Sequence, residues 1–233
     1  MSDVPDIVLL AHGSPDPRHR HGVDALAHRV REASPGRGVH TAYLDHHPPT
    51  PADAAARALS GVVVPVLLTP AYHARVDVPE AVAAMNASAG PFTVSPALGP
   101  HPLLLRAAAE LLARAGTAAD PGTAVVLYAA GSSDSAAVAS IGETLRTHGA
   151  PGGWGPWRVA ALDGGSALPE VLDELQGKAR AVVAVAFMVA EGVLRDRMAE
   201  RCAAAGVPLV PGALGDTAAA AALVLERADS LRA

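Results

Sequence analysis

Two histidines stand just beyond the ends of two hydrophobic runs, where a buried strand would open to a binding site. His12 directly follows the run 7–11, and His73 follows the run 61–69 after three residues. The carboxyl ends of parallel strands meet at one edge of a sheet, and ligands bind in the crevice outside that edge. Imidazole is the commonest metal ligand in proteins, and near neutral pH it also accepts protons. The pair therefore predicts a site that handles a metal ion and protons together.

A carboxylate stands in the matching place on a third run. Asp45 follows the run 39–44, and with the two histidines it would complete a metal site of two nitrogens and one oxygen. Such mixed sites suit Fe, Co, Ni or Zn and leave coordination positions open. The alternative is that Asp45 caps the next helix, although Thr50 already serves there. The neighbouring His46 and His47 are either solvated loop residues or auxiliary ligands.

Polar residues around the two histidines indicate loops that bind a ligand. Gly13 allows the backbone to approach a ligand closely. Ser14 either caps the following helix or belongs to a turn whose amides face an anion. Tyr72 and Arg75 flank His73, and the guanidinium of Arg75 suits carboxylates. We expect substrate-binding roles for Gly13, Ser14, Tyr72 and Arg75.

Three further polar segments each allow two interpretations. Asp77 either caps the helix that follows it or orients His73 through a hydrogen bond. The basic tract 16–21 is either a flexible, solvated loop or a lid over an anionic ligand. His101 either begins a helix at the edge of the sheet or faces the crevice.

Short apolar runs alternate with helical periodicities, which is typical of βαβ units and a parallel sheet. In the first half we expect strands at 7–11, 39–44, 61–68 and 92–95, and helices at 22–33, 51–59, 79–86 and 103–115. Thr50 and Pro51 form an N-cap and first turn for the second of these helices. The continuous apolar run 61–68 is typical of a strand buried on both faces.

The pattern restarts after a loop-forming segment at 116–122, and the second half repeats the first. Gly13–Ser14 recurs as Gly131–Ser132, and Leu44–Asp45 recurs as Leu162–Asp163, both 118 positions further on. Repetition at a fixed offset is the signature of a duplicated structural unit.

The two copies differ in their chemistry, because Ala130 stands where the first half has His12. We predict an α/β fold of two similar three-layer units with parallel sheets, related by a pseudo-two-fold axis with a cleft between them. Residues 1–117 would form the unit that carries the active site, and residues 118–233 its degenerate repeat.

The composition excludes several other classes of function. The chain has 233 residues, a net charge of −5 and no Lys/Arg-rich run, which argues against a nucleic-acid partner. Its single cysteine excludes a disulfide framework within the chain. We expect no membrane span and no signal peptide, and hence a cytoplasmic protein. Nucleotide-binding glycine motifs are absent, and Ser14 lacks the setting of a hydrolase nucleophile.

The motifs resemble those of the sirohydrochlorin chelatase family. They are His12–Gly13–Ser14 with Asp16–Pro17, Ala42–Tyr43–Leu44–Asp45, Pro65–Leu68, Tyr72–Pro79 and Leu98–Pro102. The second half resembles the degenerate repeat of the longer bacterial members.

The resemblance implies a class II chelatase, which inserts Co2+ or Fe2+, and in some members Ni2+, into a tetrapyrrole without ATP or an organic cofactor. The family's two metal-site histidines correspond to His12 and His73, and Asp45 stands where the family commonly has Glu. Sirohydrochlorin or a related tetrapyrrole would be the substrate, for siroheme or cobalamin biosynthesis. The internal duplication would replace a dimer, so we expect a monomer. The alternative is a carrier that binds metal or tetrapyrrole without catalysis.

Overall fold

The computed structural model describes residues 4–69, 76–132 and 135–231. In the first half the elements are β1 (Asp6–Ala11), α1 (Pro17–Ala33), β2 (Val39–Tyr43), α2 (Pro51–Ala58), β3 (Gly61–Pro65), α4 (Asp77–Ser88), β4 (Phe92–Val94) and α5 (Pro102–Arg114). In the second half they are β5 (Thr123–Ala129), α6 (Ser135–His148), β6 (Trp157–Ala161), α7 (Leu168–Leu175), β7 (Ala181–Phe187), α8 (Val193–Ala204), the 3-10 turn η1 (Leu214–Asp216) and α9 (Ala218–Asp229).

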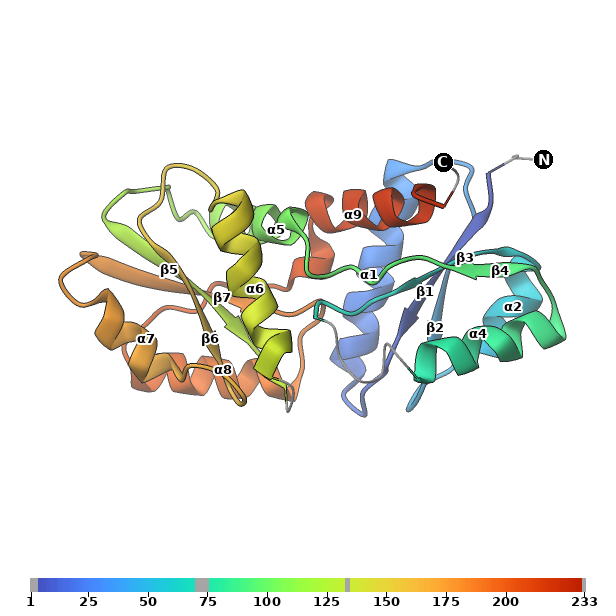
Figure 1. Cartoon of the computed structure of the whole chain (residues 1–233), viewed down its shortest axis with the longest axis horizontal. Helices are drawn as coiled ribbons and strands as arrows, with labels where there is room; N and C mark the ends of the chain where they lie inside the picture. Colours follow the sequence, from blue (N-terminus) through green and yellow to red (C-terminus); the bar gives the residue numbers. More distant parts are fainter. Residues whose placement is uncertain (1–3, 70–75, 133–134, 232–233) are drawn as a thin grey trace.

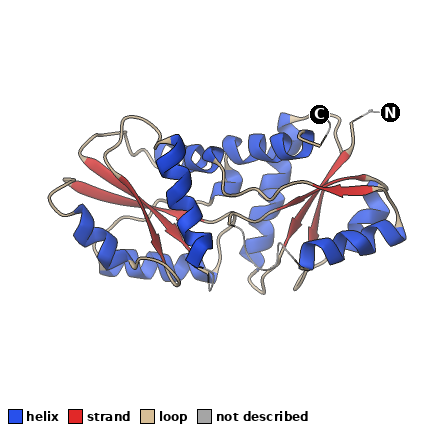
Figure 2. Cartoon of the chain, in the orientation of Figure 1, coloured by secondary structure: helices blue, strands red, loops and turns tan. Residues whose placement is uncertain are grey.

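These elements form two parallel sheets, one in each half of the chain. The first has the strand order β2-β1-β3-β4 and the second the order β6-β5-β7. Each sheet lies between helices, as Figure 2 shows, so each half is a three-layer α/β unit. In both units the first strand of the half lies between the second and the third, and Leu9 of β1 pairs with Thr41 and Val64. The predicted fold class is therefore confirmed.

Successive residues of β1 point to opposite faces of the sheet, as the geometry of a strand requires. Val8 and Leu10 pack with apolar residues of α2 and α4. Ile7 and Leu9 pack on the other face with apolar residues of α1 and α9. Residues 7–11 are at most 1% exposed, so β1 is buried on both faces and only its ends reach solvent.

The last helix of each half packs against the other unit. The helix α9 lies on α1 and β3 of the N-terminal unit, and α5 contacts β7 and α6 of the C-terminal unit. In Figure 1, α9 accordingly crosses the upper part of α1, near the first sheet, although it is the last helix of the chain. One apolar core joins the facing sides of the two units, and residues of both sheets, α5 and α9 belong to it. The two repeats are thus interlocked through an exchange of helices.

The start of α2 agrees with the expectation, whereas the start of α1 does not. Thr50 accepts a hydrogen bond from the Asp53 amide, and Asp53 bonds back to residue 50, which forms a capping box. The helix α1 begins at Pro17, five residues earlier than the apolar periodicity suggested. Asp16 caps it and Pro17 occupies its first turn, a combination that favours helix initiation. The tract 16–21 is therefore a helix start, and its prediction as a flexible loop was wrong.

The strand β3 is shorter than predicted. It ends at Pro65, because the Leu67 amide turns back to the Pro65 carbonyl at 2.9 Å and the chain leaves the sheet.

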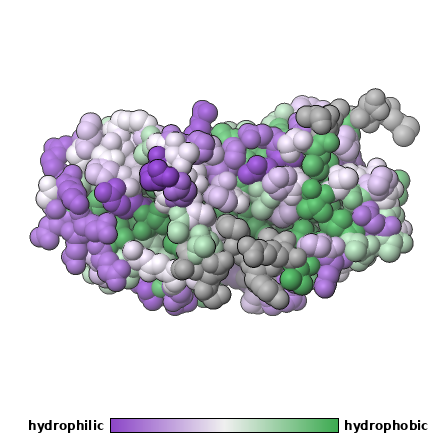
Figure 3. Space-filling model, viewed as in Figure 1, coloured by the Kyte–Doolittle hydropathy of each residue, from purple (hydrophilic) through white to green (hydrophobic). Residues whose placement is uncertain are grey.

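The face of the molecule drawn in Figure 3 is mostly hydrophilic over the outer end of the C-terminal unit. Among the described residues, no helix has both the length and the apolar character that crossing a bilayer requires.

Candidate functional site

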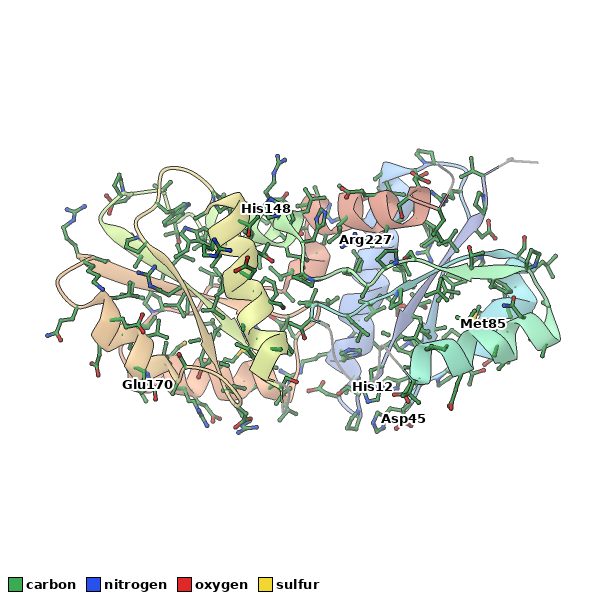
Figure 4. The ribbon with its side chains drawn as sticks, in the orientation of Figure 1. His12, Asp45, Met85, His148, Glu170 and Arg227 are labelled. Carbon is green, nitrogen blue, oxygen red and sulfur yellow. The ribbon has the colours of Figure 1, made fainter. Side chains whose placement is uncertain are left out.

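His12 leaves the central strand β1 at its carboxyl end, in a half-buried position. Its carbonyl accepts the Asp45 amide at 2.9 Å, so the loops after β1 and β2 are joined side by side. Figure 4 accordingly shows His12 and Asp45 at the same end of the N-terminal unit. The structure thus brings two of the three predicted metal ligands to one edge of the sheet. His73, Tyr72 and Arg75 lie outside the described residues.

Gly13 is required by the close approach of these two loops. Its φ is +100°, and a Cβ there would lie 2.0 Å from the Asp45 carbonyl oxygen. Gly131 repeats this arrangement against Asp163, with a φ of +94° and the same 2.0 Å distance. The repeat inferred from the sequence therefore extends to the backbone geometry of the site.

The Asp45 carboxylate is open to solvent, with 65% of its side chain exposed. It accepts the His46 amide at 2.7 Å, and the His46 ring lies 3.5 Å away. His46 has a φ of 68°, in the left-handed region that non-glycine residues seldom adopt. Among the described residues, no three His, Cys, Asp or Glu side chains converge on one point as a metal site.

Ser14 does not cap α1, because Asp16 takes that role. The Asp16 carboxylate accepts the Arg18 amide at 2.9 Å, and Ser14 Oγ in turn accepts the Asp16 amide at 3.2 Å. The first of the two roles predicted for Ser14, the helix cap, is therefore wrong, since the helix begins two residues later than that role requires. The Ser14 hydroxyl supports the capping residue instead.

Arg18 connects the two units. Its guanidinium lies 2.6 Å from carboxylate oxygens of both Asp16 and Asp196, the latter in α8. The hydrogen bond from Arg18 lowers the pKa of Asp16 to about 2, and the Val193 amide of α8 also contributes. Because it is held by two carboxylates, Arg18 is engaged in joining α1 to α8.

A pocket of about 190 Å³ lies between the two units. It is lined by His19, residues 66–69, residues 129–131, Val138, Ile141 and residues 187–190. The N-terminal unit thus supplies one wall and the C-terminal unit the other. The pocket is mainly apolar, and His19 is the one ionisable side chain among its described lining residues.

His19 is a candidate that sequence reasoning placed in a solvated tract. Burial, followed by the charges of His47 and His12, lowers the pKa of its imidazole. The ring packs edge-on against Tyr43, with 6.5 Å between the ring centroids, and His47 approaches Tyr43 at 5.9 Å. The signal that could have located His19 was the Asp16–Pro17 helix start, which turns the next residues toward the strand ends.

His101 begins a helix, the first of its two predicted interpretations. Its Nδ1 accepts the Leu103 amide at 3.3 Å at the N-cap of α5. Its Nε2 lies 3.1 Å from a carboxylate oxygen of Glu226 in α9. His101 therefore joins the two exchanged helices. Asp77, in contrast, is the first residue of α4, where its charge suits the positive end of the helix dipole.

Comparison with known proteins agrees with this architecture. The CbiX family model matches residues 6–115, which include His12 and Asp45. A search of curated proteins finds no match. Two parallel-sheet α/β units with a pocket between them make a chelatase-like fold. This match of the N-terminal unit to the CbiX family confirms the resemblance to sirohydrochlorin chelatases that the motifs indicated.

Solved structures share the fold over the whole chain. SirB from Bacillus subtilis with Fe3+ is 19% identical, with a TM-score of 0.77 and 98% of both chains covered. The sirohydrochlorin chelatase SirB from Bacillus subtilis subspecies spizizenii, in complex with cobalt, is 17% identical, with a TM-score of 0.71, over 97% of this chain and 94% of that one. CbiX, described as the terminal enzyme of siroheme biosynthesis in denitrifying bacteria, is 20% identical, with a TM-score of 0.64, over 97% and 98%.

Proposed function

We propose that this protein inserts a divalent metal, Co2+ or Fe2+, into sirohydrochlorin or a related tetrapyrrole without ATP. The observation that carries the proposal is the position of His12. It stands at the carboxyl end of the central strand, in a unit whose segment after the neighbouring strand β3 borders the pocket between the two sheets. The similarity in fold to proteins solved with Fe3+ and with cobalt supports it.

Metal and macrocycle are both substrates of this reaction. Each M2+ that enters the ring replaces two pyrrole N–H protons, so the site must hold the ion and accept the protons. Imidazole does both near neutral pH. In the proposed roles His12 and His73 bind the incoming ion and take up the protons, and Asp45 contributes negative charge.

Gly13, Ser14, Tyr72 and Arg75 are the proposed substrate-binding residues. Sirohydrochlorin carries many carboxylates, which suit amide, hydroxyl and guanidinium donors. The pocket between the units, at about 190 Å³, is smaller than the roughly 300 Å³ at which ligand pockets usually begin. A macrocycle would therefore enter it by one edge, or the units would move apart as it binds.

The remaining parts of the proposal concern the cellular setting. The protein would act in the cytoplasm as a monomer without an organic cofactor, in siroheme or cobalamin biosynthesis. Mixed histidine and carboxylate sites accept several divalent ions, so cellular supply would select the metal, Ni2+ included.

The test is an anaerobic insertion assay with sirohydrochlorin and Co2+ or Fe2+, followed by the visible spectrum of the macrocycle. Relative to the wild type, His12→Ala and His73→Ala should lower kcat by about 100-fold or more, the range of a lost acid–base group. His28→Ala is the matched control, because His28 is exposed on α1, where it pairs with Glu32 of the same helix.

Two outcomes would overturn the proposal. If His12→Ala and His73→Ala insert metal as fast as the wild type, the assignment of the imidazoles is wrong. If the wild type binds sirohydrochlorin and metal but never forms the metal complex, the protein is a carrier.

A further inference from the structure

Three rings from two segments of the N-terminal unit meet at the end of β2. Tyr43, at the end of β2, is 1% exposed. His19, in the first turn of α1, and His47, in the loop after β2, both pack edge-on against it, at interplanar angles of 65° and 82°. Such edge contacts fix the orientation of each ring. The two imidazoles are therefore held in place by one buried tyrosine.

Each of these imidazoles has a buried ring nitrogen that no group in the described part of the chain satisfies. His19 Nδ1 and His47 Nε2 have no hydrogen-bond partner in the part of the chain that the structure describes. Buried side-chain nitrogens are almost always paired, so an unsatisfied one calls for a ligand or another specific reason. Two such nitrogens, on rings that pack against the same tyrosine, suit a shared metal ion.

The half-buried position of His19 favours its neutral imidazole, because burial is the largest cause that lowers its pKa. A neutral ring keeps a lone pair that can bind a ligand. Neutral imidazole is a preferred ligand of Co, Ni, Zn and Fe ions.

We propose that His19 and His47 form an auxiliary site for a divalent metal, next to the His12 site. Only these two side chains of the described chain would ligate the ion, and water would complete its coordination, so binding would be weak and reversible. If the protein is a chelatase, which is the one step that depends on the proposed function, this site would deliver metal to His12. His19 lines the pocket between the units, from which a metal ion can reach it.

The test replaces each histidine by phenylalanine, which removes the ring nitrogens but keeps an aromatic ring against Tyr43. His19→Phe and His47→Phe remove the unsatisfied nitrogens, and His21→Phe is the matched control, because His21 is exposed on the same helix. Co2+ alone is titrated into each variant and followed by ligand-field absorption and equilibrium dialysis. The wild type and His21→Phe should bind two Co2+ per chain. His19→Phe and His47→Phe each remove one of two protein ligands and should weaken the second site by more than about tenfold, the smallest loss that removal of a supporting hydrogen bond around a metal usually causes.

A structural role for the two rings predicts a different result. The number and affinity of bound Co2+ would then be the same in the wild type and in all three phenylalanine variants, which overturns the proposal. A wild type that binds a single Co2+, lost in His12→Ala, also overturns it. If the phenylalanine variants fail to fold, carbethoxylation of the wild type decides instead. Co2+ should then protect His19 and His47, but not His21, and equal modification with and without Co2+ contradicts the site.

The same variants separate this proposal from the chelatase assignment. In the insertion assay, His19→Phe and His47→Phe should raise KM for Co2+ more than they lower kcat. His21→Phe should leave both constants unchanged. If the wild type inserts no metal, the proposed function fails, but the Co2+ stoichiometry still tests the His19–His47 site.

Discussion

Gly13 and Asp45 are packed backbone against backbone, so closely that a Cβ at residue 13 would lie 2.0 Å from the Asp45 carbonyl oxygen. The same contact recurs between Gly131 and Asp163. It connects the loops after the first two strands of each unit. In the N-terminal unit it also fixes the position from which the His12 side chain emerges.

Replacement of Gly13 by alanine should therefore destabilise the protein and displace His12. The positive φ and the clash together should cost about 2–5 kcal/mol. Gly36→Ala is the control for φ alone, because Gly36 has a φ of +84° and a Cβ added there would meet no atom within 4 Å. It should cost only about 1–2 kcal/mol. Urea unfolding measures both, and equal losses would show that the loop yields to the added methyl group.

The Arg18–Asp16 pair should make stability depend on pH in the acid range. Because the pKa of Asp16 is lowered to about 2 from its usual 3.8, its contribution is complete above pH 5 and is lost as pH falls toward 2. Asn also caps helices, so Asp16→Asn removes mainly the charge. Its unfolding midpoint should lie below that of the wild type at pH 7 and approach it at pH 3.

Asp173→Asn controls for the loss of one negative charge, since Asp173 is exposed on α7. A difference between wild type and Asp16→Asn that stays constant from pH 7 to pH 3 would contradict the assigned charge pair. The pair should also weaken in high salt, because Arg18 is partly exposed.

Cys202 should react with thiol reagents only when the protein opens. It is buried in α8, and burial raises the pKa of its thiol to about 11, so little thiolate forms at neutral pH. Modification by a disulfide reagent should be slow in buffer and rapid in urea, with a midpoint that matches loss of helical circular dichroism. Rapid labelling of the folded protein would contradict the packing of α8.

The exchanged helices predict that the two repeats stay together after the chain is cut. A protease site placed within 117–122 should yield two pieces that elute as one particle, because α9 covers α1 and β3. Residues 1–117 expressed alone should unfold or self-associate, since they lack that cover. Light scattering after size exclusion measures both. A folded monomer of residues 1–117 would mean that α5 can turn back onto its own sheet.

Much of the fold can be predicted from the sequence because β1 and β3 are buried on both faces and appear as continuous apolar runs. The Thr50 cap is equally local, and so is the repeat marked by Gly13 and Gly131. The exchange of α5 and α9 could not be predicted, because an apolar helix face indicates burial but not the sheet that it covers.

The site was predictable where a residue directly follows a strand, as His12 and Asp45 do. His19 was missed because charged neighbours on both sides suggested a solvated tract, and only the Asp16–Pro17 start places it in a helix turn. Its burial depends on Tyr43 and His47, which are distant in sequence. The placements of His73, Tyr72 and Arg75 stay predictions.

Because α9 packs against the N-terminal unit, a mutation near the 3′ end of the gene would destabilise the unit that the 5′ end encodes. A premature stop ahead of Ala218 would leave the second sheet nearly whole, yet it would remove Leu223 and Val224 from the core that α9 forms with α1 and β3. The effect of a mutation would therefore depend on the sheet that a helix packs against, and not on the half of the chain that encodes the helix.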